Sequence, residues 1–310
     1  MLVDSEALLA ALRLPADSTV DAEPATTARG LAERVALCPP GGGQRLVLVR
    51  RDADEAIENN LAVLEAIART GYPRAPAPLA LIPVDGGLAS VETWDDGLTA
   101  MNVEPSPAQL EAAVDALAAL HALDVREGLR WERSPEELVP GEEIPLHRLG
   151  FAAHEREPAA APLAEAAVVL RGGPFGFVHG DAVATNVLFA PGGLRVVGFQ
   201  AAGFGPQLFD FAAFLATSGA RAGQRRELAG RYARSRGLDV FATIDNTDLA
   251  TILWGLGELL TLPRRLIEML GDDAGSAALR LAASRIEQAM REPAGGSPVA
   301  AAIRAALWPS

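Results

Sequence analysis

The sequence contains no lysine, so all 27 of its basic residues are arginine, and any mechanism that needs a lysine amine is excluded. A single cysteine, Cys38, excludes an internal disulfide and is typical of a reducing cytoplasm. No segment reaches the roughly 18 uninterrupted apolar residues of a membrane span, since the best candidate, 249–262, contains Glu258. The first residues show no basic region before their apolar ones, so we expect no secretory signal, no membrane partner and a cytoplasmic location.

Positive charge is also scarce, because the net charge is −13 over 310 residues. Nucleic-acid backbones are bound by clustered basic side chains, which argues against a nucleic-acid partner. The charge would suit a cationic small molecule, and a generally acidic surface explains it as well. Apolar residues make up 49 % and charged residues 22 %, which indicates a globular protein that forms one two-lobed enzyme or two modest domains.

The most informative stretch is 177–189, where two short apolar runs flank a polar core. Phe177-Val178 precedes the core and Val187-Leu188-Phe189 follows it. This pattern predicts two strand ends that hold a loop. The loop presents the carboxylate of Asp181 and, five residues later, the carboxamide of Asn186.

The N-terminal third alternates strand and helix patterns. Residues 4–14 predict a short helix, 18–27 are polar and turn-like, and 31–37 and 46–51 predict strands. A helix over 54–70 has Asn60 in the middle of its apolar arc. Strands over 76–83 and 87–94 follow.

The remainder is mainly helical, beginning with a capped helix after Ser106. Residues 125–165 show no clear pattern, and their acids either line a site for a cationic substrate or form a solvated face. Residues 194–200 predict a strand, and Asp210 follows. We expect helices over 224–237, 246–262, 263–271, 275–291 and 299–307. Arg231, Tyr232, Trp254 and Glu258 are candidates for the core or a pocket, with the core favoured.

The motif His179-Gly180-Asp181-x(4)-Asn186 resembles the catalytic loop of the aminoglycoside phosphotransferase and choline kinase family, which is related to protein kinases. The resemblance implies an α+β, two-lobed protein-kinase-like fold. Its small β-rich N-terminal lobe would cover 1–94 and its hinge 95–98. The helical C-terminal lobe would cover 99–310, with the catalytic loop at 177–189. It implies transfer of the γ-phosphate of ATP or GTP to a hydroxyl of an aminoglycoside, sugar or amino alcohol.

The same resemblance implies roles for individual residues. Asp181 would accept the hydroxyl proton, and Asn186 would bind Mg²⁺. His179 and Asp210 would support the loop. On the nucleotide side, Arg50 would contact the phosphates. Asn60 occupies the place of the Glu that usually pairs with this basic residue. Glu92 and Trp94 end the strand before the hinge and complete the nucleotide-binding residues that the resemblance implies.

One position departs from the family pattern, because Gly198 occupies the place of the metal-binding Asp. No carboxylate occurs between Phe189 and Phe209, so a shift in register cannot restore it. Binding of Mg²⁺ would then be weak or absent. Either the reaction is slow, a substrate or a rearranged acid supplies the missing ligand, or no transfer occurs. Two alternatives stay open: a pseudokinase that binds or regulates without phosphoryl transfer, and a loop in which Asp181 and Asn186 only stabilise a turn. A metal hydrolase built on His179 and Asp181 lacks a cluster of partner ligands. The sequence leaves the oligomeric state open.

Overall fold

The computed structural model describes residues 2–25, 31–51, 54–126, 144–268 and 273–309. Its N-terminal part is an antiparallel sheet of five strands in the order β1-β2-β3-β5-β4. The strands are β1 (Thr19–Ala25), β2 (Leu31–Cys38), β3 (Arg45–Arg51), β4 (Pro78–Val84) and β5 (Gly87–Thr93). Helix α1 (Ser5–Ala11) packs on this sheet through Leu8 and Leu9, next to Val35 and Val47. The carboxylate of Asp4 caps α1 by accepting from the backbone amides of Glu6 and Ala7.

Strand β1 corrects the prediction of a polar turn over residues 18–27. All seven residues of β1 pair with β2, from Thr19 with Cys38 to Ala25 with Ala32. The polar composition misled the prediction, because β1 is an edge strand and only one of its faces meets the core. Val20 and Ala22 supply that face, and Pro24 is tolerated at an edge, where one missing amide donor costs little.

Helix α2 (Asp54–Thr70) has the predicted bounds and joins the sheet to the rest of the molecule. Ile57, Val63, Leu64 and Ile67 are buried, as the apolar arc predicts. Its two neighbouring asparagines, Asn59 and Asn60, are buried as well. Buried amides need hydrogen-bond partners, and those partners lie on different elements.

The middle of the chain contains two small sheets, of order β10-β7 and β6-β8-β9. Their strands are β6 (Leu98–Thr99), β7 (Phe175–Val178), β8 (Val187–Ala190), β9 (Gly193–Val196) and β10 (Gly203–Pro206). Strands β8 and β9 form the hairpin expected at Gly192, with Ala190 paired to Gly193. The strand expected over 194–200 is shorter, because the chain turns at Gly198 into the short 3-10 helix η3 (Phe199–Ala201).

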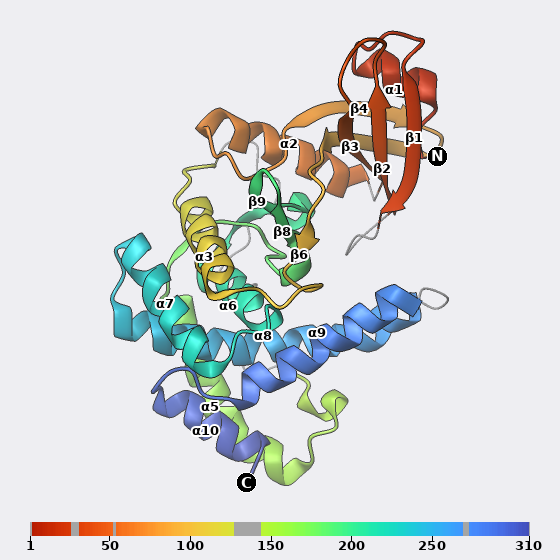
Figure 1. Ribbon diagram of the computed structural model, residues 1–310. Helices are drawn as coiled ribbons and strands as arrows, with labels where there is room; N and C mark the ends of the chain where they lie inside the picture. Colours follow the sequence, from red (N-terminus) through yellow and green to blue (C-terminus); the bar gives the residue numbers. More distant parts are fainter. Residues whose placement is uncertain (1, 26–30, 52–53, 127–143, 269–272, 310) are drawn as a thin grey trace.

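The C-terminal part is helical and contains most of the main core (Figure 1). It consists of α3 (Pro107–His121), α5 (Ala153–Arg171), α6 (Gln207–Thr217), α7 (Ala222–Arg236), α8 (Val240–Glu268), α9 (Asp273–Arg291) and α10 (Pro298–Leu307), with the short 3-10 helices η1 (Leu146–Leu149) and η2 (Ala184–Asn186). Helix α3 begins with the predicted capping box of Ser106 and Gln109.

Two helices differ from the prediction. The break expected at Pro263 is absent, and α8 continues through it to Glu268. A proline inside a helix removes one hydrogen bond, and packing of α8 against α9 compensates for that loss. The sequence of α5 gave no clear helical pattern, because Pro158 and Pro162 interrupt it. In the structure the segment is a helix that packs along α10. The acids at 136–137 and 142–143 lie outside the described residues.

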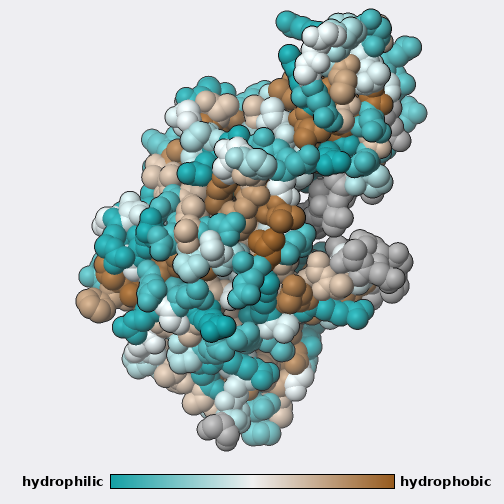
Figure 2. All heavy atoms as spheres, viewed as in Figure 1, coloured by the Kyte–Doolittle hydropathy of each residue, from teal (hydrophilic) through white to brown (hydrophobic). Residues whose placement is uncertain are grey.

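The mixed α+β class expected from the sequence is confirmed. The sheet and α1 lie at one end and the helices at the other, while α8 and α9 extend together to the side (Figure 1). Figure 2 shows a hollow between the sheet and the ends of α8 and α9, with hydrophobic surface at its inner end. Of the described helices, none is both long and apolar enough to cross a bilayer. The division at 94, 95–98 and 99 stays a prediction.

Candidate active site

The 177–189 loop is fixed from behind by Asp210 on α6. This carboxylate accepts from the backbone amides of His179, at 2.5 Å, and Gly180, at 2.8 Å. It also accepts from Nε2 of His121 on α3, at 3.1 Å. A carboxylate that accepts several N–H donors is strongly held, so α6 and α3 together determine where this loop lies.

The surroundings of Asp210 determine its protonation state. Burial raises the pKa of Asp210, but the hydrogen bond and charge of His121, with those of His179, outweigh burial and hold the pKa below its ordinary value. Nδ1 of His121 lies 2.7 Å from the Tyr232 hydroxyl. Burial raises the pKa of Tyr232, so its hydroxyl stays protonated and completes this buried contact.

Asp181 and Asn186 meet at the front of the loop. The Asn186 amide donates to the backbone oxygen of Asp181, at 2.7 Å, and to its carboxylate, at 3.2 Å. Nδ1 of His179 accepts from the backbone amide of Asp181, at 3.2 Å, while Nε2 lies 2.9 Å from the backbone oxygen of Val197. The loop therefore holds one carboxylate and one carboxamide side by side, with the amide nitrogen toward the carboxylate.

Gly198 lies directly beside this pair. Its φ is +87°, and an added Cβ would lie 3.0 Å from Oδ1 of Asn186. An acid at position 198 would therefore stand next to Asn186, where the family pattern has its metal-binding Asp. Among the described residues no three His, Cys, Asp or Glu side chains cluster in a way that could hold a metal ion. Magnesium is usually anchored by one or two carboxylates. Of the described side chains that contact Asn186, Asp181 supplies the one carboxylate, and a carboxylate bound to a metal is a poorer proton acceptor, so the donors present here fit magnesium poorly.

On the other side of Gly198, a buried cluster fixes Arg50 of β3. Its guanidinium donates to Glu92 of β5, at 3.3 Å. With its carboxamide oriented to satisfy both ends, Gln200 accepts from Nε and Nη1 of Arg50, at 2.8 and 2.7 Å, and donates to the backbone oxygen of Gly198, at 3.0 Å. Asn60 donates to Glu92, at 3.1 Å, and not to Arg50. The expectation that Asn60 replaces the acidic partner of Arg50 is therefore wrong; Glu92 is that partner.

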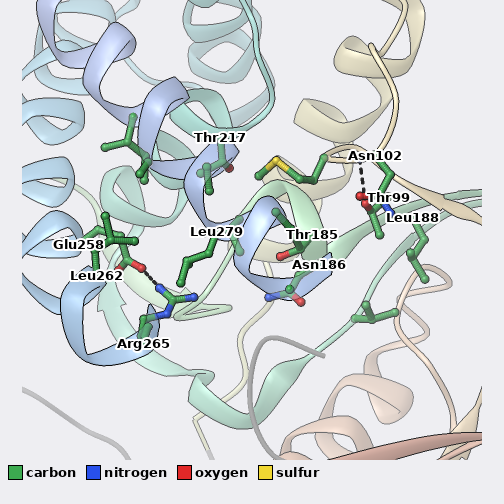
Figure 3. A pocket seen from close by; sticks show the side chains of 18 of the residues that line it. Thr99, Asn102, Thr185, Asn186, Leu188, Thr217, Glu258, Leu262, Arg265 and Leu279 are labelled. Carbon is green, nitrogen blue, oxygen red and sulfur yellow. Dashed lines mark hydrogen bonds and ion pairs between the residues drawn. The ribbon is translucent and has the colours of Figure 1, made fainter. Parts of the chain in front are cut away.

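Two cavities meet at this loop. The first lies between the sheet, the 177–189 loop and α8–α9, and its lining includes Arg50, Trp94, Asn186 and Thr217. Figure 3 shows its side chains from close by. The indole nitrogen of Trp94 is buried there without a hydrogen-bond partner among the described residues. The second cavity contains Asp181, and Trp254 and Glu258 of α8 line both cavities.

The structure thus brings Arg50, Glu92, Asn60, Trp94, Asp181, Asn186, His179, Asp210 and Gly198 to one region around two cavities. Sequence reasoning missed Gln200 and Arg265, and it favoured the core for Trp254 and Glu258. Helical spacing could have identified three of these residues, because Trp254, Glu258 and Arg265 fall on one helical face at about 100° per residue.

The braced Asp–Asn loop and the arginine on a facing sheet are the arrangement that the resemblance to phosphotransferases implies. The model of the Phosphotransferase enzyme family matches residues 29–245, well over half of the chain, and the protein belongs to that family.

Solved structures with low sequence identity share the fold. A choline/ethanolamine kinase family protein from Mesorhizobium loti is 18 % identical, with a TM-score of 0.58 over 96 % of this chain and 98 % of that one. A macrolide 2'-phosphotransferase from Brachybacterium faecium is 18 % identical, with a TM-score of 0.58 over 92 % and 98 %. An amicoumacin kinase in complex with AMP-PNP, Ca²⁺ and Ami is 15 % identical, with a TM-score of 0.58 over 96 % of both chains. A comparison with curated proteins gives no match.

Proposed function

We propose that this protein transfers the γ-phosphate of ATP or GTP to a hydroxyl of a small molecule. The observation that carries the proposal is the position of Asp181 and Asn186 where two cavities meet. A nucleotide in the first cavity and an acceptor in the second would then meet at Asp181. In this proposal residues 1–94 form the N-terminal lobe, 95–98 the hinge and 99–310 the C-terminal lobe.

Each residue has a chemical role in this arrangement. Asp181 accepts the proton of the attacking hydroxyl. Arg50, held by Glu92 and Gln200, lines the first cavity and contributes positive charge to the nucleotide side. Trp94 offers an unpaired indole N–H to the nucleotide. A structurally similar amicoumacin kinase was solved with AMP-PNP, which supports a nucleotide in this region.

A magnesium ion, when bound in this family of reactions, neutralises charge on the phosphates. Asn186 would hold it here with only the Asp181 carboxylate beside it, since Gly198 supplies none. Loss of one preorganised electrostatic group typically costs about 10²–10³ in turnover. We therefore propose weak magnesium binding and slow phosphoryl transfer.

The second cavity indicates the kind of acceptor. Phe204, Phe209 and Trp254 line it together with the carboxylates of Asp181 and Glu258. Aromatic faces and carboxylates both attract cations. A hydroxylated acceptor that carries a positive charge would fit this lining, and the net charge of −13 is consistent with it.

The test is a panel of hydroxylated acceptors, comprising an aminoglycoside, choline and a macrolide, incubated with γ-labelled ATP or GTP. We expect label on one acceptor with the wild type. Asp181→Asn should reduce transfer by about 10²–10⁴ because the proton acceptor is lost, while nucleotide affinity stays within about twofold. Equal transfer by the wild type and Asp181→Asn would contradict the role of Asp181.

A binding module without transfer is the second candidate, and Gly198 is the observation that favours it. It predicts that ATP raises the melting temperature equally with magnesium and with EDTA, and that no acceptor becomes labelled. Acceptor labelling distinguishes the two, because only the enzyme transfers the γ-phosphate, whereas a thermal shift in EDTA is expected of both.

A further inference from the structure

The first cavity has an arginine opposite the 177–189 loop that no motif predicts. Arg265 lies on α8, and its side chain is 28 % exposed and paired with Glu258. Arg265 and Asn186 both line this cavity, and Figure 3 shows the two side chains in the pocket, one from α8 and one from the loop. At about 100° per residue, Trp254, Glu258 and Arg265 fall within about 40° on α8, so this face of the helix is a cavity wall.

The charges around the cavity distinguish the two arginines. Of the described residues that line it, the charged ones are Arg50, Glu258 and Arg265. The side chain of Arg50 is only 4 % exposed, and its guanidinium is hydrogen-bonded to Glu92 and Gln200. Arg265 lies at the wall, where its ion-pair partner among the described residues is the partly exposed Glu258. It is therefore the cation that can turn toward a ligand at a small cost.

A polyphosphate needs such a cation in this protein. The chain carries a net charge of −13, and a polyanion approaching it is repelled unless the site itself is positive. The donors around Gly198 fit a magnesium ion poorly, so the metal's positive charge is missing where the family pattern provides it.

We propose that Arg265 binds the phosphates of the nucleotide and supplies the positive charge that position 198 no longer recruits. In this inference, which rests on the proposed function, the Glu258–Arg265 pair opens when the nucleotide binds. Arginine suits the exchange, because its planar fork matches phosphate oxygens as well as carboxylate oxygens. Nucleotide binding is then independent of magnesium.

The experiment measures the affinities of ATP and of adenosine by calorimetry in EDTA for four proteins: the wild type, Arg265→Ala, Arg264→Ala and Glu258→Gln. Arg264 is a matched control, since it is the adjacent exposed arginine of α8 and is not among the residues lining the cavity. Arg265→Ala should weaken ATP roughly 10–100-fold, the size expected for a charge-assisted hydrogen bond. Adenosine should bind Arg265→Ala as it binds the wild type, which also shows that the variant is folded.

Glu258→Gln tests whether Arg265 is a phosphate ligand or serves only in a structural ion pair with Glu258. If Arg265 serves the phosphates, removing the competing carboxylate should leave ATP affinity unchanged or raise it up to about 10-fold. Equal losses of ATP affinity in Arg265→Ala and Glu258→Gln would overturn the proposal, as would equal ATP affinity in Arg265→Ala and Arg264→Ala. Equal weakening of ATP and adenosine would overturn it too.

The wild type distinguishes failure of this inference from failure of the function. ATP binding that requires magnesium overturns the role of Arg265 and leaves the phosphotransferase proposal intact. If the wild type binds neither ATP nor GTP, with or without magnesium, both proposals are wrong.

Discussion

Two glycines decide the geometry of the loop, for different reasons. Gly180 has φ +78°, and an added Cβ would lie 2.0 Å from the backbone oxygen of Ala201. Gly198 also has a positive φ, but its nearest obstacle is the end of a side chain, Asn186. A side chain can move where a backbone cannot, so we expect position 180 to reject every substitution and position 198 to accept a small one.

We expect Gly180→Ala to lower the free energy of unfolding by about 2–4 kcal/mol, from overpacking and left-handed strain together. Urea denaturation at neutral pH measures this. Gly192→Ala is the control, because its Cβ would meet nothing within 4 Å; that variant should stay within about 0.5 kcal/mol of the wild type. Similar stabilities of the two variants would show that the loop does not approach Ala201 so closely.

We expect Gly198→Asp to make ATP binding magnesium-dependent, because its carboxylate would stand beside Asn186. The left-handed backbone should cost about 1 kcal/mol of stability, as Asp tolerates that region better than most residues. Thermal shifts with ATP, in magnesium and in EDTA, measure both effects. Gly198→Ala carries the same backbone cost without the carboxylate, so a magnesium effect in Gly198→Ala as well would count against our interpretation of this position.

Sequence reasoning found Asp181 and Asn186 because they lie five residues apart in one loop. It placed Arg50 on the nucleotide side but gave it the wrong partner. The contact of Arg50 with Glu92 spans 42 residues and depends on the register of β3 and β5, in which Arg50 is opposite Ser90. Such pairings follow from strand register and are not visible in one-dimensional spacing.

At the scale of the elements, three helices hold the loop through one carboxylate. Asp210 on α6, His121 on α3 and Tyr232 on α7 form a buried chain of hydrogen bonds that ends at the amides of His179 and Gly180. This chain contains an ion with a lowered pKa, so it makes the stability of the protein depend on pH.

The folded pKa of Asp210 lies below the unfolded value of 3.8. The ionised Asp210 therefore contributes fully to the free energy of unfolding above pH 3.8, and this contribution is lost as the pH falls through the folded pKa. We expect Asp210→Asn to lower stability by about 3 kcal/mol at pH 7 and pH 5, because an amide cannot accept from both backbone N–H groups as a carboxylate does. The difference from the wild type should shrink below pH 3.8.

Urea denaturation at several pH values checks this brace. Asp124→Asn is the control, since Asp124 forms an exposed ion pair with Arg126 and should change stability little. If Asp210→Asn lowers the free energy of unfolding by the same amount well below pH 3.8 as at pH 7, the charge of Asp210 is not what holds the loop.

Element prediction succeeded where periodicity was strong, as in α2, and failed where composition hid the pattern. Strand β1 looks polar because it lies at the edge of the sheet. Helix α8 contains Pro263, which predicts a break, but its packing on α9 outweighs the lost hydrogen bond. These outcomes depend on tertiary neighbours that local sequence does not reveal.

At the scale of the whole molecule, the sheet is joined to the helical part through the side of α2. The amide of Asn59, which is fully buried, donates to the backbone oxygens of Gln200, at 3.0 Å, and Ala202, at 3.1 Å. The same segment carries Gln200, which accepts hydrogen bonds from Arg50, so this contact aligns the two walls of the first cavity.

We expect Asn59→Ala to lower stability by about 2–4 kcal/mol, because two buried carbonyls lose their donor. Nucleotide affinity should fall as well, since Gln200 is no longer held. Chemical denaturation and calorimetry measure the two effects. Glu65→Ala, an exposed position on the same helix, should change neither.

Helix α8 has one further consequence for the whole protein. Trp254 and Glu258 each belong to the walls of both cavities. Any free energy by which an acceptor shifts these two side chains must alter the dissociation constant of the nucleotide. By reciprocity the nucleotide alters the acceptor's dissociation constant by the same factor. Under the proposed function, binding in one cavity therefore changes the affinity of the other through Trp254 and Glu258, the residues that both cavities share.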